Sequence, residues 1–372
     1  MKPNKQVINL IQDLATPHNN VLIAQFKECD NVEIKLWYAR NMDKTLYQWS
    51  GDIVNEHFQA KIYGATFNWL FIKYCLMHPA EKFIIVGWMN TNTRLIHLLF
   101  FLLRRPFNYW TDLPYSRGRG MGLRQKILRW SAYKLLKYAH AKVFCVGITT
   151  LNYFRALGFS ADQLVGLPIF VTVDDDLAAY HARHSQLLEQ YGVKPHGFLI
   201  AAGSRLIYEK GYDLLIRAIA LLDDEIRQQI KVVIVGSGES LTKLQQLVLN
   251  LNLSRQVVME QWLAIDDFKV LIANSDVFVH PSRFDSYGGT TLGMALGVPV
   301  IGSYGSGAAF DRIEQGRNGF LYEAEDIQTL ANFIALLYKN PNLKHEMGMA
   351  AYQTARQWHP QRGVDIILNN AI

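Results

Sequence analysis

The sequence is poor in the residues that build disulfide frameworks or metal clusters. It holds three cysteines among 372 residues, Cys29, Cys75 and Cys145, and their spacing matches no metal or redox motif. We therefore expect free, buried thiols in a reducing compartment. Long hydrophobic runs are also missing, because the most apolar stretch, residues 95–103, is far shorter than the roughly 20 residues of a spanning helix. The N-terminus lacks a secretory leader pattern, so the sequence predicts a cytoplasmic protein, soluble or peripheral on the inner face of the membrane.

The composition is that of a folded chain with a surplus of positive charge. Half of the residues are hydrophobic and 19% are charged, which excludes global disorder. The net charge of +6 and the pI near 9.0 favour an anionic partner. Nucleic acid, an acidic membrane surface and a phosphorylated substrate all satisfy this requirement.

Short aliphatic runs alternate with helix-period stretches along the whole chain, which is typical of a parallel sheet wound with helices. The pattern forms two series that join near residues 168–176, so it predicts two α/β domains, at residues 1–180 and 181–355. A C-terminal segment, residues 356–372, is expected to pack back on the first domain. Two doubly wound halves would bind ligands at the carboxyl ends of their strands. The expected strands are residues 7–11, 32–37, 83–86, 107–110 and 142–146, then 198–202, 231–235, 257–259, 277–280, 299–302 and 320–322.

Two cations follow the first strand of the second series. Arg205 and Lys210 lie in the loop between a strand that ends at Gly203 and a helix that begins near Gly211. An arginine fork and a lysine point charge at this edge can neutralise a diphosphate. The alternative is a pair of solvated loop cations.

A glycine pair follows the next strand of this series. Gly236 and Gly238 would let the backbone approach a ligand at a helix N-terminus. A full dinucleotide fingerprint needs a further glycine where this chain has Leu241, so the motif gives little support to NAD binding. A tight strand–helix turn is the alternative.

The most informative stretch is residues 280–303, HPSRFDSYGGTTLGMALGVPVIGS. A strand ends at His280, a polar loop carries Asp285, and a short helix opens at residues 288–291. The backbone N–H groups of Gly289, Thr290 and Thr291 would cradle a phosphate. Asp285 could accept hydrogen bonds from sugar hydroxyls. The alternatives are plain helix-start residues and a loop-forming aspartate.

Together these stretches resemble the donor domain of the large retaining glycosyltransferase family 4, the group 1 glycosyltransferases, whose GT-B fold has two Rossmann-like domains facing a cleft. The resemblance rests on ordered matches over about 150 residues. They are residues 203–206 with 210–214, 275–282, 297–301 and 316–321.

The resemblance implies roles for individual residues. Arg205 and Lys210 would bind the donor diphosphate and stabilise charge on the leaving group, so that no metal and no cofactor is needed, and Asp285 would act with them at the reacting sugar. Residues 261–265 would contact the nucleotide base. The donor-binding set is Gly203, Ser204, Gly236, Gly238, Trp262, Leu263, Tyr287, Gly288, Gly289, Thr290 and Thr291.

The chain also departs from the family pattern of two glutamates eight positions apart. Asp285, one methylene shorter, stands at the first position. The second falls on Gly293, or on Leu292 if a one-residue deletion is placed earlier, and neither is acidic. In the family the second glutamate typically binds the nucleotide ribose. That contact is therefore lost here or supplied by another residue.

The first half resembles the family less. His18, Asn19 and Asn20 follow the first strand, where the family has a glycine-rich loop, and are acceptor-side candidates; polar helix capping is the alternative. Asp112 follows a later strand and is the acceptor-side candidate for a group near the reacting sugar, or else it caps a turn.

A basic amphipathic helix is expected within residues 117–142, from Arg117 to Lys142. Arg124, Lys126 and Arg129 alternate with apolar residues that include Trp130. Such a helix can lie in an anionic membrane interface. The alternative is an ordinary helix with a solvated basic face.

The resulting hypothesis is a glycosyltransferase that moves a hexose-type unit from a nucleotide diphosphate sugar, a UDP- or GDP-sugar, to a carbohydrate or lipid-linked acceptor in cell-surface polysaccharide or glycolipid synthesis. Two alternatives are a nucleotide-sugar epimerase of the same fold and a non-catalytic sugar-nucleotide-binding subunit. Nucleic-acid binding is not expected, because the basic residues alternate with apolar helix positions and match no recognition motif.

Overall fold

The computed structural model describes residues 5–40, 60–88, 90–113 and 122–372. The chain forms two compact units, residues 1–170 with 360–372, and residues 171–359. The sequence places the first boundary ten residues later, at residue 180, and the second at residue 355. The first boundary lies earlier in the structure because Val171, Val173 and Leu177 pack against the core of the second unit.

The first unit is built on a seven-stranded parallel sheet in the order β3-β2-β1-β4-β5-β6-β7. All five strands predicted for this half are present. The two outermost strands were not predicted, because three residues are too few to show an alternation pattern. The strands are β1 (Gln6–Gln12), β2 (Val32–Tyr38), β3 (Ala60–Ile62), β4 (Lys82–Val86), β5 (Phe107–Thr111), β6 (Ala141–Cys145) and β7 (Leu164–Gly166).

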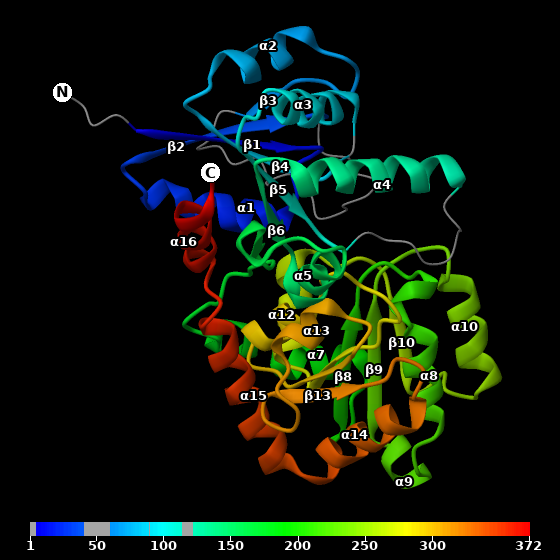
Figure 1. Cartoon of the computed structure of the whole chain (residues 1–372). Helices are drawn as coiled ribbons and strands as arrows, with labels where there is room; N and C mark the ends of the chain where they lie inside the picture. The colour runs from blue at the N-terminus through cyan, green and yellow to red at the C-terminus, as the bar shows by residue number, and fades with distance from the viewer. Residues whose placement is uncertain (1–4, 41–59, 89, 114–121) are drawn as a thin grey trace. The chain divides into compact units, whose positions relative to one another are not determined.

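The end of the chain returns to the first unit as α16 (Pro360–Asn370), which lies beside α1 (Pro17–Ala24) in Figure 1. The Asn108 amide donates to the carbonyl of Ile372 and accepts from its N–H, both at 3.1 Å. These bonds fasten the terminus to the middle of the sheet. The remaining helices of this unit are η1 (Gln25–Glu28), α2 (Trp69–Met77), α3 (Thr91–Leu102), α4 (Leu123–Tyr138), α5 (Gly147–Ala156) and η2 (Ala161–Gln163).

The second unit has a six-stranded parallel sheet in the order β10-β9-β8-β11-β12-β13. Every strand lies within one residue of its predicted bounds. The strands are β8 (Phe198–Gly203), β9 (Ile230–Val235), β10 (Val257–Glu260), β11 (Val277–His280), β12 (Val300–Ser303) and β13 (Gly319–Tyr322). The helices are α6 (Ala178–His181), α7 (His184–Tyr191), η3 (Tyr208–Lys210), α8 (Tyr212–Ala220), α9 (Asp224–Arg227), α10 (Leu241–Asn250), α11 (Ile265–Ala273), α12 (Thr290–Ala295), α13 (Gly307–Arg312), α14 (Ile327–Lys339) and α15 (Pro341–Arg356).

Helices cover both faces of this second sheet, as Figure 1 shows for α8 and α10 on one side and α15 on the other. The apolar residues of α8, α10 and α14 pack on one face. Those of α7, α11, α12, α13 and α15 pack on the opposite face. Because both faces are covered, the central strands are buried throughout, and apart from His280 at the end of β11 they are apolar rather than alternating.

The strand order places β8 directly beside β11, although about 75 residues separate them in sequence. The chain leaves β8 toward β9 and leaves β11 toward β12, so the connections diverge from this point. In open α/β sheets, ligands bind at the carboxyl ends of the strands where the order reverses. The loops that follow Gly203 and His280 meet there. No helix among the described residues has the length and apolar character to cross a membrane.

Candidate functional site

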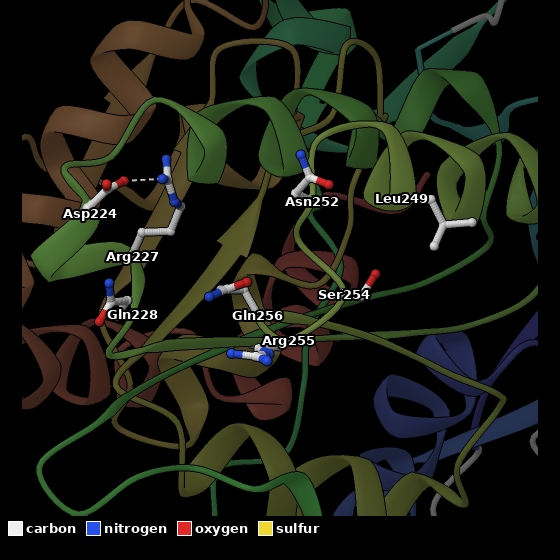
Figure 2. A pocket seen from close by; sticks show the side chains of 8 residues that line it. All are labelled: Asp224, Arg227, Gln228, Leu249, Asn252, Ser254, Arg255 and Gln256. Atoms are coloured by element: carbon white, nitrogen blue, oxygen red, sulfur yellow. Dashed lines mark hydrogen bonds and ion pairs between the residues drawn. The ribbon is translucent and has the colours of Figure 1, made fainter.

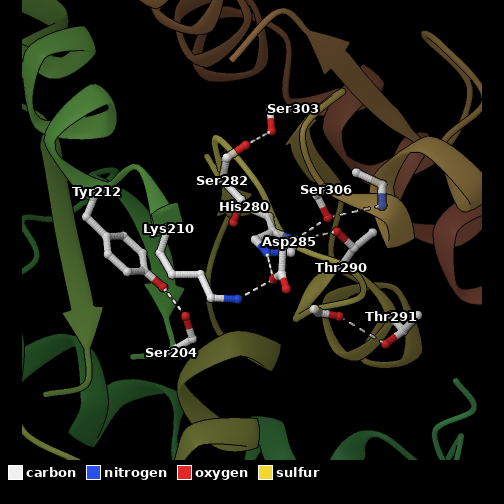
Figure 3. A network of polar contacts seen from close by, with 12 residues as sticks. Ser204, Lys210, Tyr212, His280, Ser282, Asp285, Thr290, Thr291, Ser303 and Ser306 are labelled. Carbon is white, nitrogen blue, oxygen red and sulfur yellow. Dashed lines mark hydrogen bonds and ion pairs between the residues drawn. The ribbon is translucent and has the colours of Figure 1, made fainter. Parts of the chain in front are cut away.

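A buried ion pair joins the loops at this reversal point. Lys210 is the last residue of η3, between β8 and α8, and only 8% of it is exposed. Its ammonium group pairs with Oδ2 of Asp285, in the loop after β11 (Figure 3). Burying an ammonium group without a partner is strongly unfavourable, so the carboxylate stabilises the lysine in this position. Two residues that the sequence motifs predicted for the site are thereby brought together.

The Asp285 carboxylate is held in its ionised form. Burial by itself would raise the pKa of this group. The Lys210 ammonium group and the hydrogen bond from His280 outweigh burial and lower the pKa of Asp285 from 3.8 to about 2. Asp285 is therefore an anion at any physiological pH.

His280 is a further member of the site, and no motif in the sequence indicated it. It is the last residue of β11 and is buried. Its Nε2 lies 3.1 Å from Oδ2 of Asp285, and its Nδ1 lies 2.8 Å from Oγ1 of Thr290 and 3.1 Å from Oγ of Ser306. The signal available in the sequence was a lone histidine at the end of a fully apolar strand.

Arg283 holds the loop after β11 in place through its side-chain contacts. Its guanidinium group donates two parallel bonds of 2.7 Å to Asp213 and a third of 2.7 Å to Glu325. It also stacks on the Tyr208 ring, 4.2 Å from the centroid. Since Asp213 belongs to α8 and Tyr208 to η3, these contacts tie the loop after β11 to the segment that carries Lys210.

Glycines allow the loops at this edge to pack backbone against backbone. A Cβ at Gly236 would lie 1.9 Å from the carbonyl oxygen of Ser204, and one at Gly238 would lie 2.4 Å from that of Leu206. A Cβ at Gly211, whose φ is +67°, would lie 2.1 Å from the carbonyl oxygen of Pro281. The atoms nearest to these glycines belong to neighbouring loops. The loops can therefore pack this closely because glycine has no side chain.

The other donor-side residues on the β8 and β9 loops lie close to this contact. Arg205 is exposed on the loop after β8. Ser204 Oγ lies 2.7 Å from the hydroxyl of Tyr212. The Trp262 ring is half-buried, and its N–H donates to Oγ of Ser237, between the two glycines of the β9 loop. Its neighbour Leu263 packs against the core.

The predicted phosphate-binding segment has buried hydroxyls. Thr290 is fully buried and its hydroxyl faces His280. Thr291 is also buried, and its hydroxyl donates to the carbonyl of Gly288. Gly289 packs against Phe278. The two hydroxyls therefore contact protein groups, and the backbone of this segment is what a ligand could reach.

Tyr287, also in the predicted donor-binding set, contacts Arg312 of α13. Its ring is buried and its hydroxyl accepts a hydrogen bond of 2.9 Å from Nε of Arg312. Burial is the main cause that raises its pKa.

The structure distinguishes the two positions at which the second family glutamate could fall. Gly293 is buried, and a Cβ there would lie 3.0 Å from Val300 and 3.1 Å from Phe278. A carboxylate at this position would enter the core of the sheet. Leu292 is half-buried and packs at the edge of the same core. Leu292 is therefore the position from which a longer acidic side chain could reach solvent.

The acceptor-side candidates belong to the first unit. Asp112 is exposed directly after β5. Asn19 donates from its amide to Gln12 at the end of β1, and Thr16 accepts from the Asn19 N–H as the N-cap of α1. The backbone of His18 lies in the first turn of this helix, while its side chain lies outside the described residues. The backbone of Asn20 bonds to Thr16, and Asn20 is buried.

A polar hollow lies at the opposite, amino edge of the second sheet (Figure 2). Asp224 and Arg227 form an ion pair on one side of it, and Arg255 and Gln256 lie just before β10. It is separated from Lys210 and Asp285 by the length of the strands. In the part of the chain that the structure describes, no three His, Cys, Asp or Glu side chains are grouped so as to hold a metal ion.

Comparison with known proteins shows that the unit carrying this site is similar to glycosyltransferases. Residues 186–354 match the family model for glycosyl transferases group 1. The chain is 28% identical over 231 residues to a GDP-mannose-dependent alpha-(1-6)-phosphatidylinositol monomannoside mannosyltransferase of Mycolicibacterium smegmatis, a match that covers 59% of this chain and 57% of that protein. It is 30% identical over 240 residues to the putative glycosyltransferase EpsD of Bacillus subtilis, covering 63% and 61%. The matches thus span about three fifths of each relative's length.

The fold is shared with solved structures, among them that of WaaG, a glycosyltransferase involved in lipopolysaccharide biosynthesis, which superposes with a TM-score of 0.71 over 97% of this chain and 99% of that chain at 16% identity. HepE of Anabaena, crystallised in complex with UDP, superposes with a TM-score of 0.75 over 98% of both chains at 22% identity. The two parallel-sheet, Rossmann-like units are those of the GT-B fold.

Proposed function

Because this chain carries a group 1 glycosyl transferase domain at residues 186–354, we propose that it transfers a sugar from a nucleotide diphosphate sugar, a UDP- or GDP-sugar, to a carbohydrate or lipid-linked carbohydrate acceptor. The anomeric configuration is retained. Two relatives support this proposal: the GDP-mannose-dependent mannosyltransferase, and a capsular polysaccharide biosynthesis glycosyltransferase, CapM, of Staphylococcus aureus. The acceptor then belongs to cell-surface polysaccharide or glycolipid synthesis.

The observation that carries this proposal is the buried Lys210 ammonium group at the reversal point of the sheet. An ammonium group has three donors, so Lys210 can keep its bond to Asp285 and still donate to a phosphate oxygen. Arg205 on the same loop supplies a second, exposed cation. Together they would hold the diphosphate and stabilise the charge that develops on it.

The reaction needs no protein nucleophile in this scheme. The bond between the anomeric carbon and the donor phosphate oxygen breaks, and a bond from the same carbon to the acceptor oxygen forms on the same face. The acceptor proton passes to the leaving phosphate, which becomes the free nucleoside diphosphate. The carboxylate of Asp285, fixed as an anion, would accept a hydrogen bond from a donor sugar hydroxyl.

The proposal is tested by donor binding. UDP-, GDP-, ADP- and dTDP-sugars are titrated into the protein and into its Lys210→Ala and Arg205→Ala variants, with the exposed Lys243→Ala variant as a matched lysine control. A charge-assisted hydrogen bond contributes about 1.5–3 kcal/mol, so each site variant should weaken binding roughly 10- to 100-fold. Lys243→Ala should bind like the parent. Absence of binding to any sugar nucleotide, or unchanged binding in both site variants, contradicts the proposal.

Measuring the reaction products distinguishes a transferase from the two alternatives, an epimerase and a non-catalytic subunit. A transferase releases the nucleoside diphosphate when an acceptor is present, whereas an epimerase returns the donor as a different nucleotide sugar. A non-catalytic subunit binds the donor and converts none of it. Following donor and product by chromatography, with and without an acceptor mixture, distinguishes the three.

Catalysis is proposed to be independent of metal, because Lys210 and Arg205 take the place that a divalent ion holds in other transferases. Activity should therefore be unchanged within about twofold after dialysis against EDTA. A loss that Mg²⁺ or Mn²⁺ restores would contradict this part of the proposal.

We also propose that α4 binds an anionic membrane surface. The exposed apolar side chains of its first turns, Leu123, Ile127, Leu128 and Trp130, alternate with the exposed Arg124 and Lys126. The helix has no acidic residue. Residues 117–121 of the expected basic segment lie outside the described residues.

The charge of the surrounding sequence supports an anionic partner. Residues 83–161 hold twelve arginines and lysines and one acidic residue, Asp112, a net charge of +11. Since the whole chain carries +6, all other residues together carry −5. The positive charge is therefore concentrated in the first unit, and it includes α4.

Liposome sedimentation tests this surface. Each basic residue near an anionic bilayer contributes about 1 kcal/mol, so Arg124→Glu/Lys126→Glu should weaken binding to phosphatidylglycerol vesicles by roughly 30-fold or more. Replacing the exposed Lys339 of the second unit by Glu is the matched charge control and should have little effect. Equal binding of the parent to neutral and anionic vesicles would contradict an electrostatic anchor.

A further inference from the structure

The ring of His280 is held on both of its nitrogens inside the site. A buried imidazole is unfavourable unless its polar atoms are hydrogen-bonded. An ionised carboxylate can only accept, so Nε2 carries a proton and donates it to Oδ2 of Asp285, at 3.1 Å. In the neutral ring, Nδ1 then accepts from the hydroxyls of Thr290, at 2.8 Å, and Ser306, at 3.1 Å.

These partners come from separate segments of the second unit (Figure 3). Asp285 lies in the loop after β11, Thr290 is the first residue of α12, and Ser306 is the N-cap of α13, where its Oγ also accepts from the Ala309 N–H. All three are buried or nearly so. A single ring at the end of a central strand therefore connects one loop with the starts of two helices.

The position of Asp285 depends on few other side chains. Among the described residues, its ion pair and side-chain hydrogen bonds all use Oδ2, which faces Lys210 and His280. The packing around the pair is close, because a Cβ at Gly288 would lie 2.3 Å from Oδ2 of Asp285 and 2.4 Å from Cε1 of His280. With Oδ2 engaged twice, Oδ1 is the oxygen left to meet a ligand.

We propose that His280 is a positioning residue that fixes the Asp285 carboxylate, and through it the Lys210 ammonium group, in the orientation used for the donor sugar and diphosphate. This inference rests on the proposed function for the identity of the ligand. The shorter aspartate makes the support necessary, since its carboxylate lies closer to its own backbone than that of a glutamate. The ring also anchors Thr290, so the backbone at the start of α12 depends on the same residue.

Three variants of His280 distinguish the hydrogen bond at Nε2 from those at Nδ1. His280→Gln can place an amide N–H near the Nε2 position and keep the bond to Asp285. His280→Asn can place an amide oxygen near the Nδ1 position and keep the bonds from Thr290 and Ser306, but it loses Asp285. His280→Phe keeps the ring shape and loses both sets of bonds. Ser303→Ala is the matched stability control, because Ser303 is fully buried at the end of β12 and, among the described residues, its hydroxyl bonds only to the backbone carbonyl of Ser282.

The first measurement needs no donor. The charged and titratable groups that face His280 and Asp285 are Lys210 and, from α8, Tyr212. Loss of the His280 hydrogen bond should raise the pKa of Asp285 in His280→Asn and His280→Phe, followed by carboxyl NMR in the ligand-free protein. His280→Gln and Ser303→Ala should titrate like the parent. Equal behaviour of the Gln and Asn variants would overturn the positioning role.

The second measurement is donor turnover. His280→Asn and His280→Phe should lower kcat by roughly 10- to 100-fold, the usual range for a lost charge-assisted bond, and should move the acid limb of the pH profile to higher pH. His280→Gln should retain kcat within about threefold, and Ser303→Ala should leave the profile unchanged. If the carboxyl titration behaves as expected while the parent binds no sugar nucleotide, the proposed function fails and the positioning of Asp285 stands. A kcat that is equal in all three His280 variants contradicts the inference.

Discussion

At the scale of single residues, Asp285 departs from the family pattern by one methylene, and its contacts explain how a shorter acid fits. Its carboxylate does not extend outward but lies buried between Lys210 and His280. A buried cation and a buried anion are tolerated here because each partners the other. Removing either one leaves the other charge buried and unpaired.

Asp285 should contribute to stability with a defined pH dependence. Its pKa is lowered from 3.8 to about 2, so the contribution is fully present above pH 4 and is lost as the pH falls toward 2. A shift of this size corresponds to about 2 kcal/mol. Asp285→Asn should therefore lower the free energy of unfolding by about that amount at pH 7, measured by urea denaturation.

Urea denaturation at pH 5, 4 and 3 tests whether the stabilisation by Asp285 is lost, as expected, when the pH falls. The difference between the parent and Asp285→Asn should be constant from pH 7 to 5 and should shrink below pH 4. Asp162→Asn, at an exposed position in η2, is the matched control and should change little at any pH. A difference that grows on acidification would contradict the assignment.

At the scale of elements, the loops after β8, β9 and β11 pack directly on one another, and glycines make this possible. The Leu206 N–H donates to the carbonyl of Ser237 at 2.7 Å, and the Ser240 N–H donates to the carbonyl of Leu206 at 2.9 Å. These bonds hold the β8 loop, which carries Arg205, against the β9 loop. The position of the cations is thus a property of the paired loops.

Gly236→Ala should destabilise the protein by about 2–3 kcal/mol, because its Cβ would lie 1.9 Å from the carbonyl oxygen of Ser204 and one of the two loops must move. Gly316→Ala is the matched control: its φ is also positive, +77°, but nothing lies within 4 Å of the new Cβ. The control should cost only about 1–2 kcal/mol of backbone strain. Thermal or urea unfolding measures both, and donor affinity should fall only in Gly236→Ala.

At the scale of the whole molecule, the chain crosses from one unit to the other twice, after Phe170 and after His359. The second crossing makes the last residues part of the first unit. Gly363 of α16 lies where a Cβ would be 2.5 Å from both Leu22 and Phe170. The C-terminal helix therefore contributes to the core of the unit formed by the N-terminal half.

Gly363→Val should destabilise the first unit and leave the second intact. Hydrogen exchange should become faster in β1 and β4, while β8 and β9 keep their protection. Gly348→Val is the reciprocal variant, because a Cβ there would lie 2.4 Å from the carbonyl oxygen of Gly297 in the second unit. It should accelerate exchange in β11 and β12 instead. Equal acceleration in both units by either variant would contradict the division.

Much of the fold could be predicted because buried parallel strands leave a local signal. The runs at 198–202 and 277–279 are apolar at every position, and the structure has β8 and β11 there. The short strands β3 and β7 could not be found, since their place is set by pairing with β2 and β6. The cations and the aspartate of the site could be named from motif order, whereas the role of His280 depends on atoms up to 26 positions away in sequence.

By itself, the sequence determined the two α/β series, the GT-B fold and the similarity of residues 186–354 to group 1 glycosyl transferases, because strand patterns and motifs consist of consecutive residues. Only the tertiary structure decided which side chains meet. The strand order puts β8 beside β11, and this brings Lys210 to Asp285 and gives His280 its three partners. The reason is physical: a buried charge or imidazole needs partners wherever the fold supplies them, and nearness in the sheet does not follow from nearness in the chain.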